Sequence, residues 1–260
     1  MNQETRDRVR ALLTSFMERW IADSIPAGEL EQIANEGVSP RGLLTPFHDA
    51  LVPGITRLGE RSFSTRLGNL HEDIASVIAE EVHMDVQQPL DLTGSIPVLS
   101  REFITQRIRQ LERREAEPDG PYERGQLLGH FGERVSVSTR IDLYVRTHDG
   151  DEHFFEIKSG KPNKGQCIEM KQRSMTALAI RQSESAFAWW GIPYNPYGVG
   201  PYLHAFALPF FDFEHEVMIG EEFWNFVGGE GAYEELLEVY REVGEEFGDR
   251  LRELREQLIV

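Results

Sequence analysis

Apolar residues recur every three or four positions over much of the chain, which is the spacing of helices that bury one face. One clear stripe, Leu67 to Ile78, follows Ser64, a residue suited to cap a helix N-terminus. The pattern predicts helices over residues 3–22, about 64–83, 101–115, about 165–189, 221–227 and about 231–257. Helical pieces broken by proline are expected between residues 28 and 60. Residues 86–100 and 116–125 are expected to form loops because both are rich in Pro and Gly.

The pattern changes to period two between residues 135 and 157. Apolar side chains occupy odd positions on both sides of a turn sequence, His148-Asp149-Gly150: Val135, Val137, Ile141, Leu143, Val145, Phe155 and Ile157. This alternation predicts two antiparallel strands joined by a tight loop. Further strands are expected near 201–208 and 214–219. The succession of helices, hairpin, helix, strands and helices favours a single α/β (α+β) domain with a helical N-terminal half.

The composition excludes several classes of protein. The 260 residues contain no apolar run long enough for a membrane helix, and the charged N-terminus lacks a signal-peptide core. We therefore expect a cytoplasmic protein with no membrane association. A single cysteine, Cys167, argues against a disulfide framework and a Cys-rich zinc site. The absence of G-x-S-x-G and Walker motifs argues against serine hydrolases and nucleoside triphosphatases.

A basic segment interrupts an acidic chain. The formal net charge of −17 argues against a nucleic-acid partner, because phosphate contacts need Lys and Arg. All four lysines nevertheless lie between Glu156 and Lys171. Residues 158–181 carry four Lys and two Arg against one Glu, a balance of +5. This segment is a candidate anion-binding surface, and the alternative is a solvated helix face.

The predicted hairpin brings two acids and a lysine together. Asp142, Glu156 and Lys158 all hold even positions, opposite the apolar face. A two-residue turn would place Asp142 across from Ile157, whereas a three-residue loop places it across from Glu156. We predict the longer loop, because Gly150 supplies the left-handed residue that such loops use. Neighbouring carboxylates repel unless a cation lies between them, and Mg²⁺ suits oxygen ligands. The alternative is a surface hairpin with charged outer positions.

Several motifs carry a resemblance to a known family. The segments RIDLYV and FFEIKSGKPNKGQ resemble the catalytic core of the PD-(D/E)xK nucleases, and more narrowly type II restriction endonucleases of the TdeIII kind. SFSTRLGNLHEDIA, NPYG and GEEFWNFVGG are also similar, so the resemblance covers about residues 60–240. It implies a mixed central sheet flanked by helices in a nuclease domain at 61–260, with a helical region at 1–60 packed on it.

The resemblance also assigns roles to site residues. It implies that Asp142 and Glu156 hold Mg²⁺ and that Lys158 is the catalytic lysine. Ile141 stands where the family usually has Pro. Glu72, on the predicted helix at 64–83, would complete the site. Since Glu72 lies opposite that helix's apolar stripe, it faces either the cleft or only solvent.

Residues around the lysine cluster are candidates for DNA contact. Polar and basic side chains in the loop and the following helix suit phosphates or base edges: Lys161, Asn163, Lys164, Gln166, Lys171 and Arg173. The alternative is a solvated helix N-terminus. Asn195, in a loop rich in Pro and Gly, either contacts DNA or forms a turn.

Together these observations predict a type II restriction endonuclease. The resemblance implies Mg²⁺-dependent, sequence-specific hydrolysis of double-stranded DNA, a GGNCC-type site and a cognate methyltransferase as a separate protein. A homodimer is expected, because a two-fold symmetric target is best read by a two-fold protein. The alternatives are a repair or junction nuclease guided by DNA structure, a catalytically inactive DNA-binding protein on the same fold, and a protein-binding role for the acidic surface.

Overall fold

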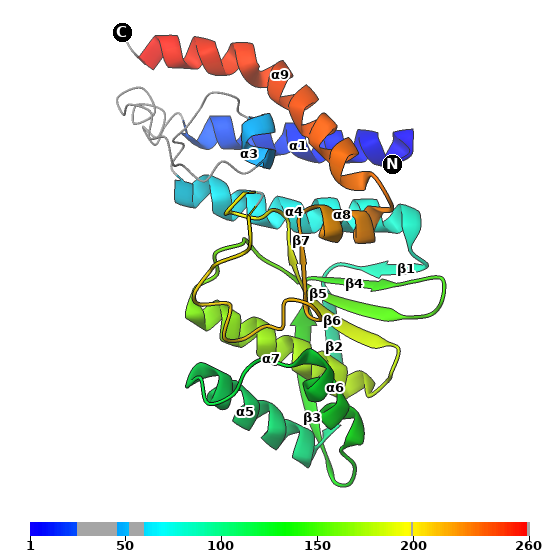
Figure 1. Cartoon of the computed structure of the whole chain (residues 1–260). Helices are drawn as coiled ribbons and strands as arrows, with labels where there is room; N and C mark the ends of the chain where they lie inside the picture. Colours follow the sequence, from blue (N-terminus) through cyan, green and yellow to red (C-terminus); the bar gives the residue numbers. More distant parts are fainter. Residues whose placement is uncertain (25–45, 52–59, 199, 259–260) are drawn as a thin grey trace.

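The computed structural model describes residues 1–24, 46–51, 60–198 and 200–258 (Figure 1). The helices in these ranges are α1 (Gln3–Ser24), α3 (Pro46–Leu51), α4 (Glu60–Val82), α5 (Val98–Glu112), α6 (Gly120–Gly129), α7 (Lys164–Arg181), α8 (Glu221–Gly228) and α9 (Ala232–Leu258). The strands are β1 (Asp85–Gln87), β2 (Leu90–Pro97), β3 (Arg134–Ile141), β4 (Leu143–Arg146), β5 (Glu152–Ile157), β6 (Ala186–Ile192) and β7 (Val217–Ile219). None of these helices is long and apolar enough to cross a membrane.

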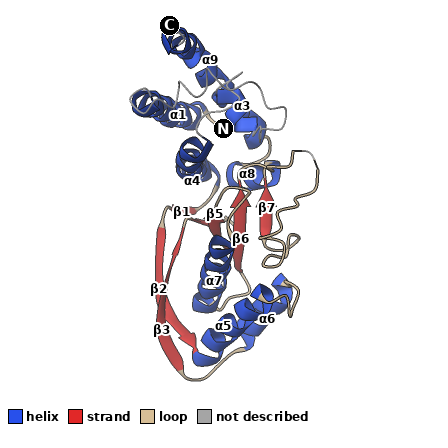
Figure 2. Ribbon diagram, turned by 90° about the vertical axis from the view of Figure 1, so that its left-hand side faces the viewer, coloured by secondary structure: helices blue, strands red, loops and turns tan. Residues whose placement is uncertain are grey.

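A mixed sheet forms the middle layer of the molecule. Within the described ranges its strand order is β1-β4-β5-β6-β7. The pairs β1–β4 and β4–β5 are antiparallel, whereas β5–β6 and β6–β7 are parallel. Helices cover both faces, with α4 and α8 on one side and α7 on the other (Figure 2). The expectation of a mixed α/β fold with helices flanking a central sheet is therefore confirmed.

The N-terminal and C-terminal helices share one core above the sheet. Val9 of α1, Ile74 of α4 and Tyr240 of α9 belong to the same buried cluster as Phe155 of β5. Ion pairs between Arg6 and Glu242 also join α1 to α9. The expected helical N-terminal region thus packs on the rest of the chain through α1, and its boundary at residue 60 stays a prediction. The pieces expected between 28 and 60 lie mostly outside the described residues, apart from α3.

The opposite face of the sheet carries α7 and a two-stranded ribbon. Strands β2 and β3 pair antiparallel along their whole length, from Leu90 with Ile141 to Pro97 with Arg134. Leu92 and Ile96 point inward, and Gly94 lies so close to α7 that an added Cβ would come within 2.6 Å of Ile180. The ribbon therefore curves around one side of α7, and α5 and α6 also pack against α7 (Figure 2).

Two segments expected to be loops are regular structure. Residues 86–100 contain β1, β2 and the start of α5, because buried Leu92 and Ile96 alternate with exposed Thr93 and Ser95. Pro89, Gly94 and Pro97 in this segment favour a loop in the sequence pattern, although the other residues alternate as in a strand. Residues 116–125 contain most of the first two turns of α6, where the Asp119 side chain accepts a hydrogen bond from the Tyr122 N–H. Proline in the first turn of a helix is well tolerated, so it did not mark a loop here.

Three further boundaries differ from the prediction. The strand expected over 135–147 breaks at Asp142, and its two parts, β3 and β4, lie in different sheets. The helix expected to reach 189 ends at Arg181, where Gln182 adopts a left-handed conformation, and β6 follows. An all-apolar run such as AFAWWGI fits either a helix or a buried strand. No strand forms over 201–208, where irregular chain is followed by turns from residue 205, whereas β7 is found within 214–219.

Candidate active site

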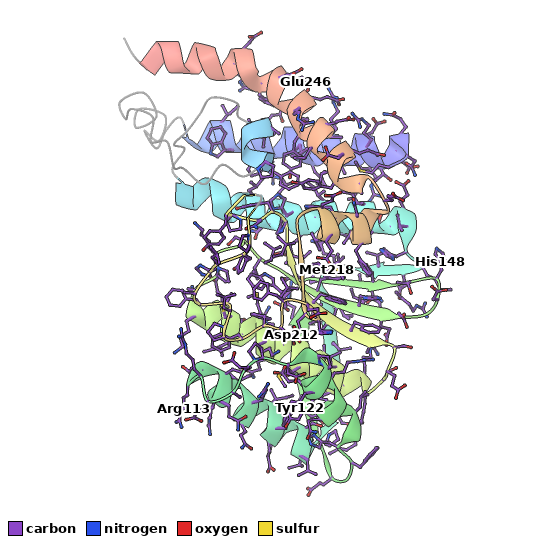
Figure 3. All side chains as sticks on the ribbon, in the orientation of Figure 1. Arg113, Tyr122, His148, Asp212, Met218 and Glu246 are labelled. Atoms are coloured by element: carbon purple, nitrogen blue, oxygen red, sulfur yellow. The ribbon has the colours of Figure 1, made fainter. Side chains whose placement is uncertain are left out.

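The β4–β5 hairpin has the predicted three-residue loop. Leu143 pairs with Phe155 and Arg146 with Glu152, and the Thr147 N–H donates to the Asp151 carbonyl at 2.9 Å. His148, Asp149 and Gly150 make the turn, with Gly150 at φ +93°. His148 lies at the free end of the hairpin (Figure 3). The same register, continued by one residue, sets Asp142 across from Glu156.

Asp142 occupies the point where β3 leaves the main sheet. Its Oδ2 atom accepts hydrogen bonds from the Ile157 backbone N–H at 2.9 Å and from the Lys158 Nζ at 2.6 Å. The carboxylate thus takes the place of a strand carbonyl for Ile157, because the ladder is interrupted here. The Asp142 side chain is largely buried. This burial removes the interpretation of the hairpin as a solvent-exposed one with charged outer positions.

Lys158 lies at the centre of the acidic cluster. Its Nζ atom is 2.6 Å from Asp142 Oδ2 and 3.4 Å from Glu72 Oε1. Burial opposes its charged form, but the neighbouring carboxylates outweigh burial, so the pKa of Lys158 is raised. The positive charge of Lys158 is thus held in place by the carboxylates around it.

Glu156 is the most deeply buried acid of the cluster. Its side chain is 1% exposed, and burial followed by the charge of Asp142 raises its pKa to about 8. Its Oε2 atom accepts a hydrogen bond from Arg173 at 3.3 Å. Its Oε1 atom is buried and has no hydrogen-bond partner among the described residues. An unpartnered buried carboxylate oxygen is a position that a cation would satisfy.

Helix α4 directs two adjacent side chains to different places. Glu72 is part-buried beside Lys158, and burial together with Asp142 raises its pKa. His71 instead packs among aromatic rings, including Phe47 and Trp224, and burial lowers its pKa to about 3. Of the two positions left open for Glu72, the structure shows the one beside the acidic cluster.

Comparison with known proteins identifies the family. A family model described as "Type II restriction endonuclease, HinfI" matches residues 5–244. The chain is also 35% identical to the type II restriction enzyme HgiCII of Herpetosiphon aurantiacus, over 94% of this chain and 95% of the relative. The type II restriction enzyme HgiBI of the same organism is 34% identical, with 94% of each chain covered. The chain belongs to the HinfI family of type II restriction endonucleases.

Family membership confirms the expectation of a type II site-specific deoxyribonuclease. It also supports the expected DNA substrate and the use of a divalent metal ion by this class of enzyme. These matches do not test the narrower resemblance to TdeIII-type enzymes or to the PD-(D/E)xK core, so both stay predictions.

The residues expected to contact DNA occupy different environments in this restriction enzyme. Lys161 and Lys164 are exposed; Lys161 lies over the Tyr197 ring at 5.1 Å, and Lys164 pairs with Glu112 at 3.0 Å. Arg173 bridges Glu156 and Glu169. Each therefore remains within reach of a ligand at this surface.

Three polar residues of the expected set have local structural roles. Asn163 and Gln166 form a reciprocal capping box at the start of α7, each side chain accepting the other's backbone N–H. Asn195 accepts from the Tyr197 N–H and donates to the Gly200 carbonyl, which fits the turn-forming alternative. These contacts occupy the side-chain oxygens of Asn163 and Gln166 and both polar atoms of the Asn195 side chain.

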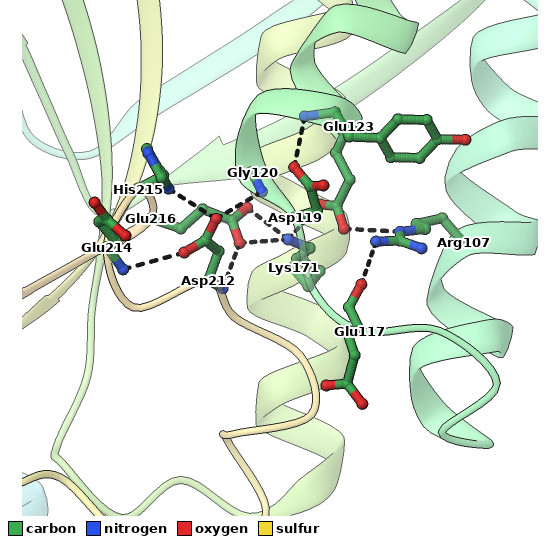
Figure 4. Close-up of polar contacts among 11 residues, drawn as sticks. Arg107, Glu117, Asp119, Gly120, Glu123, Lys171, Asp212, Glu214, His215 and Glu216 are labelled. Atoms are coloured by element: carbon green, nitrogen blue, oxygen red, sulfur yellow. Dashed lines mark hydrogen bonds and ion pairs between the residues drawn. The ribbon is translucent and has the colours of Figure 1, made fainter.

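Lys171 is buried, so the expectation that it contacts DNA does not fit this structure. Its side chain is 0% exposed, and its ammonium lies 2.5 Å from both Glu123 Oε2 and Glu216 Oε1 (Figure 4). Arg107 donates to Glu123 at 2.8 Å, which extends the network from α7 to α5. The spacing of Lys171 with the buried residues Cys167, Met170 and Ser174 was a signal of this burial. The acids that pair with it are far away in sequence.

Proposed function

We propose that this enzyme hydrolyses phosphodiester bonds of double-stranded DNA at a specific sequence, with Mg²⁺ held by Asp142 and Glu156. The observation that carries the proposal is the register that sets these two acids opposite each other, with the Lys158 ammonium 2.6 Å from Asp142. The same arrangement supports an assignment to the PD-(D/E)xK superfamily, in which two acids and a lysine form the site.

The donor set suits a hard divalent cation that keeps part of its water shell. Among the described residues, no three His, Cys, Asp or Glu side chains form a ready metal-binding group. Two carboxylates remain, one with the unpartnered Oε1 of Glu156, and Mg²⁺ commonly binds through one or two carboxylates plus water and substrate oxygens. A metal ion bound there would supply a Lewis acid and lower the pKa of a bound water.

The protein groups have separate tasks in this scheme. Glu156 would hold the metal ion as a carboxylate, and its raised pKa means that metal binding there would release a proton. Lys158 places a fixed positive charge where the phosphate gains negative charge. Glu72 orients the Lys158 ammonium from the α4 side. Lys161, Lys164 and Arg173 supply positive charge for the DNA backbone next to the cut.

The proposal is tested by incubating wild type, Lys158→Ala and Arg113→Ala with long mixed-sequence DNA, with Mg²⁺ or EDTA. Arg113 is the control because it is a 69% exposed cation whose ion-pair partner, Glu115 at 3.8 Å, lies outside the candidate site. Discrete fragments from wild type and Arg113→Ala, with Mg²⁺ only, support the proposal. Cutting at junctions or damaged sites instead would favour a repair nuclease. No cutting at any salt, or equal cutting by Lys158→Ala, would overturn the catalytic assignment.

The partners of the enzyme belong to the same proposal. We infer a homodimer from the expected two-fold symmetry of the target, and sedimentation with and without DNA measures its stoichiometry. The fragment ends from the cleavage assay test whether the site is of the GGNCC type that the TdeIII resemblance implies. The cytoplasmic location and the separate cognate methyltransferase stay predictions.

A further inference from the structure

A polar groove of about 380 Å³ runs between α7 and the β2–β3 ribbon. Polar residues of both elements line it: Thr93, Ser138 and Arg140 of the ribbon, and Gln172, Arg173 and Thr176 of α7. On α7, Thr176 lies four positions after Gln172 and three after Arg173, so it neighbours both on the helix surface. The groove is thus built by two elements that the hydrophobic core holds in a fixed relation.

The groove starts at the candidate active site. Arg173, which lines it, donates to Glu156 at 3.3 Å. On the ribbon side, Arg140 precedes Asp142 by two residues along the same chain segment. A DNA duplex whose phosphate reaches Lys158 would therefore bring its neighbouring base pairs toward this groove.

The groups in the groove are suited to base edges more than to phosphates. Two arginines, Arg140 and Arg173, are matched by two acids of the same groove, Asp91 and Glu169, so it carries no net charge. Phosphate binding depends on an excess of positive charge. A balanced set of donors and acceptors, by contrast, suits the donor and acceptor pattern of base pairs in the major groove.

Several of these groups have hydrogen-bonding capacity to spare. Within the described part of the chain, the buried Oγ1 of Thr139 has no hydrogen-bond partner, and the side chains of Thr93, Ser138 and Gln172 are exposed in the groove. Arg140 lies 3.8 Å from Asp91, and both side chains are more than half exposed. Exposed pairs of this kind contribute little, so Arg140 is free to exchange its partner for a ligand.

The ribbon exposes small polar side chains, which suit a contact with DNA beside the groove. The paired positions Thr93–Ser138 and Ser95–Ser136 are exposed and carry only small hydroxyl side chains, and Thr93 and Ser138 also border the groove beside α7. The ribbon stands clear of the helical layer formed by α1, α4 and α9 (Figure 2). The major groove of DNA admits a two-stranded ribbon of this kind.

We propose that base pairs flanking the cut are read in this groove, with Arg140 and Gln172 as specificity-determining residues. This inference rests on the proposed function and goes beyond it by separating the residues that read bases from those that grip phosphates. The Arg140 guanidinium matches the O6 and N7 acceptors of guanine, and the Gln172 amide matches N6 and N7 of adenine. Lys164 serves the backbone and carries no sequence information.

The test uses binding, in the cutting-deficient Lys158→Ala protein without metal. Arg140→Ala, Gln172→Ala and, as the control, Lys164→Ala are each added to it. Affinity is measured for the DNA that wild type cuts and for duplexes with one base pair changed at a time, over a range of salt. Thermal unfolding verifies that each variant is folded, which is expected because all three side chains are exposed.

The expected results differ between the two classes of residue. Arg140→Ala and Gln172→Ala should each lower discrimination about 10- to 100-fold at one or two positions of the site and leave the others unchanged. Lys164→Ala should weaken binding to all duplexes alike and reduce the salt dependence by about one phosphate contact. A uniform loss of affinity in the groove variants, with every base preference kept, would overturn the inference while the proposed function stands. No DNA binding or cleavage by any protein would overturn both.

Discussion

Replacing Lys171 by methionine removes the cation that two buried carboxylates share. The ammonium is 0% exposed, and the side chains of Glu123 and Glu216 are 3% and 14% exposed. Methionine has a similar length and no charge, so it fills the space but leaves the acids unbalanced. The variant therefore measures what the buried network contributes, separately from packing.

The structure sets the size of the expected loss. Removing one partner of a buried ion pair typically costs about 3–5 kcal/mol, because the other charge stays buried. Two residual contacts reduce the loss here: Arg107 still pairs with Glu123, and the Asp212 N–H still donates to Glu216 at 2.9 Å. We therefore expect a loss of about 3 kcal/mol, a large part of the ~5–15 kcal/mol that stabilises a typical domain.

The loss should depend on pH and on Glu216. Burial raises the pKa of Glu216, and without Lys171 nothing of opposite charge contacts that carboxyl within the described network. When the pKa of a carboxyl is higher in the folded than in the unfolded protein, its stabilising effect is complete below the unfolded-state pKa and is lost as pH rises toward the folded-state pKa. The deficit of Lys171→Met should thus be larger at pH 8 than at pH 5, and adding Glu216→Gln should recover much of it at pH 8.

Urea unfolding at both pH values provides the assay, with Lys164→Met as the control on the same helix. Lys164 and its partner Glu112 are 49% and 39% exposed, so its loss should leave the urea midpoint unchanged within error. A deficit for Lys171→Met below about 1 kcal/mol, or no recovery on adding Glu216→Gln, would refute the reasoning from buried charge. If Lys171→Met lost DNA affinity while fully folded, and Lys164→Met did not, the prediction from sequence that Lys171 contacts DNA would be supported after all.

Three further outcomes follow from other parts of the structure. Glu156→Gln should stabilise the metal-free protein by about 2–4 kcal/mol at pH 8 and leave it unchanged at pH 4.5, because the carboxyl with a pKa of about 8 loses stability as pH rises. Urea unfolding measures this, and added Mg²⁺ should stabilise wild type alone. Burial lowers the pKa of His71 to about 3, so the folded protein keeps His71 neutral while the unfolded chain takes up a proton below about pH 6.5, and stability falls there. His71→Leu should remove this fall, which amounts to about 1.4 kcal/mol per pH unit. An unchanged slope of stability against pH in urea titrations would contradict this. Gly94→Ala should cost about 1–3 kcal/mol, because its Cβ would lie 2.6 Å from Ile180, whereas Gly125→Ala, with open space around it, should stabilise α6; thermal unfolding compares the two.

The site could be predicted from sequence where its geometry is local. Alternation of apolar residues fixes which face Asp142 and Glu156 share, and a left-handed Gly150 selects the loop length that pairs them. Both features depend on fewer than 20 consecutive residues. The side chain of Glu72 was left open because a helix stripe shows which face is buried and not what covers the other face.

The rest depended on contacts between distant segments. Lys171 lies in a basic run, and only the approach of Glu216 and Glu123 from other elements makes its burial stable. The ribbon strand β2 is not predicted because Pro89, Gly94 and Pro97 in and before it are typical of a loop, and only the packing of α7 against Gly94 explains that glycine. The break at Asp142 has the same origin, since β3 leaves the sheet to pair with β2, from Leu90 with Ile141 to Pro97 with Arg134, far earlier in the chain.

The distribution of lysine follows from the chemistry of its charge. This chain has 23 arginines and four lysines, and two of the lysines, Lys158 and Lys171, each bring a single nitrogen close to two carboxylates at once. An ammonium is a compact point charge with three donors directed from one atom, whereas the planar guanidinium of arginine spreads its donors over a fork. In a site already filled by Asp142 and Glu72, or enclosed by Glu123 and Glu216, the smaller group fits between oxygens that a fork would push apart. Lysine is thus kept where acids converge on one point, and the candidate active site and the buried network use the same property of this side chain.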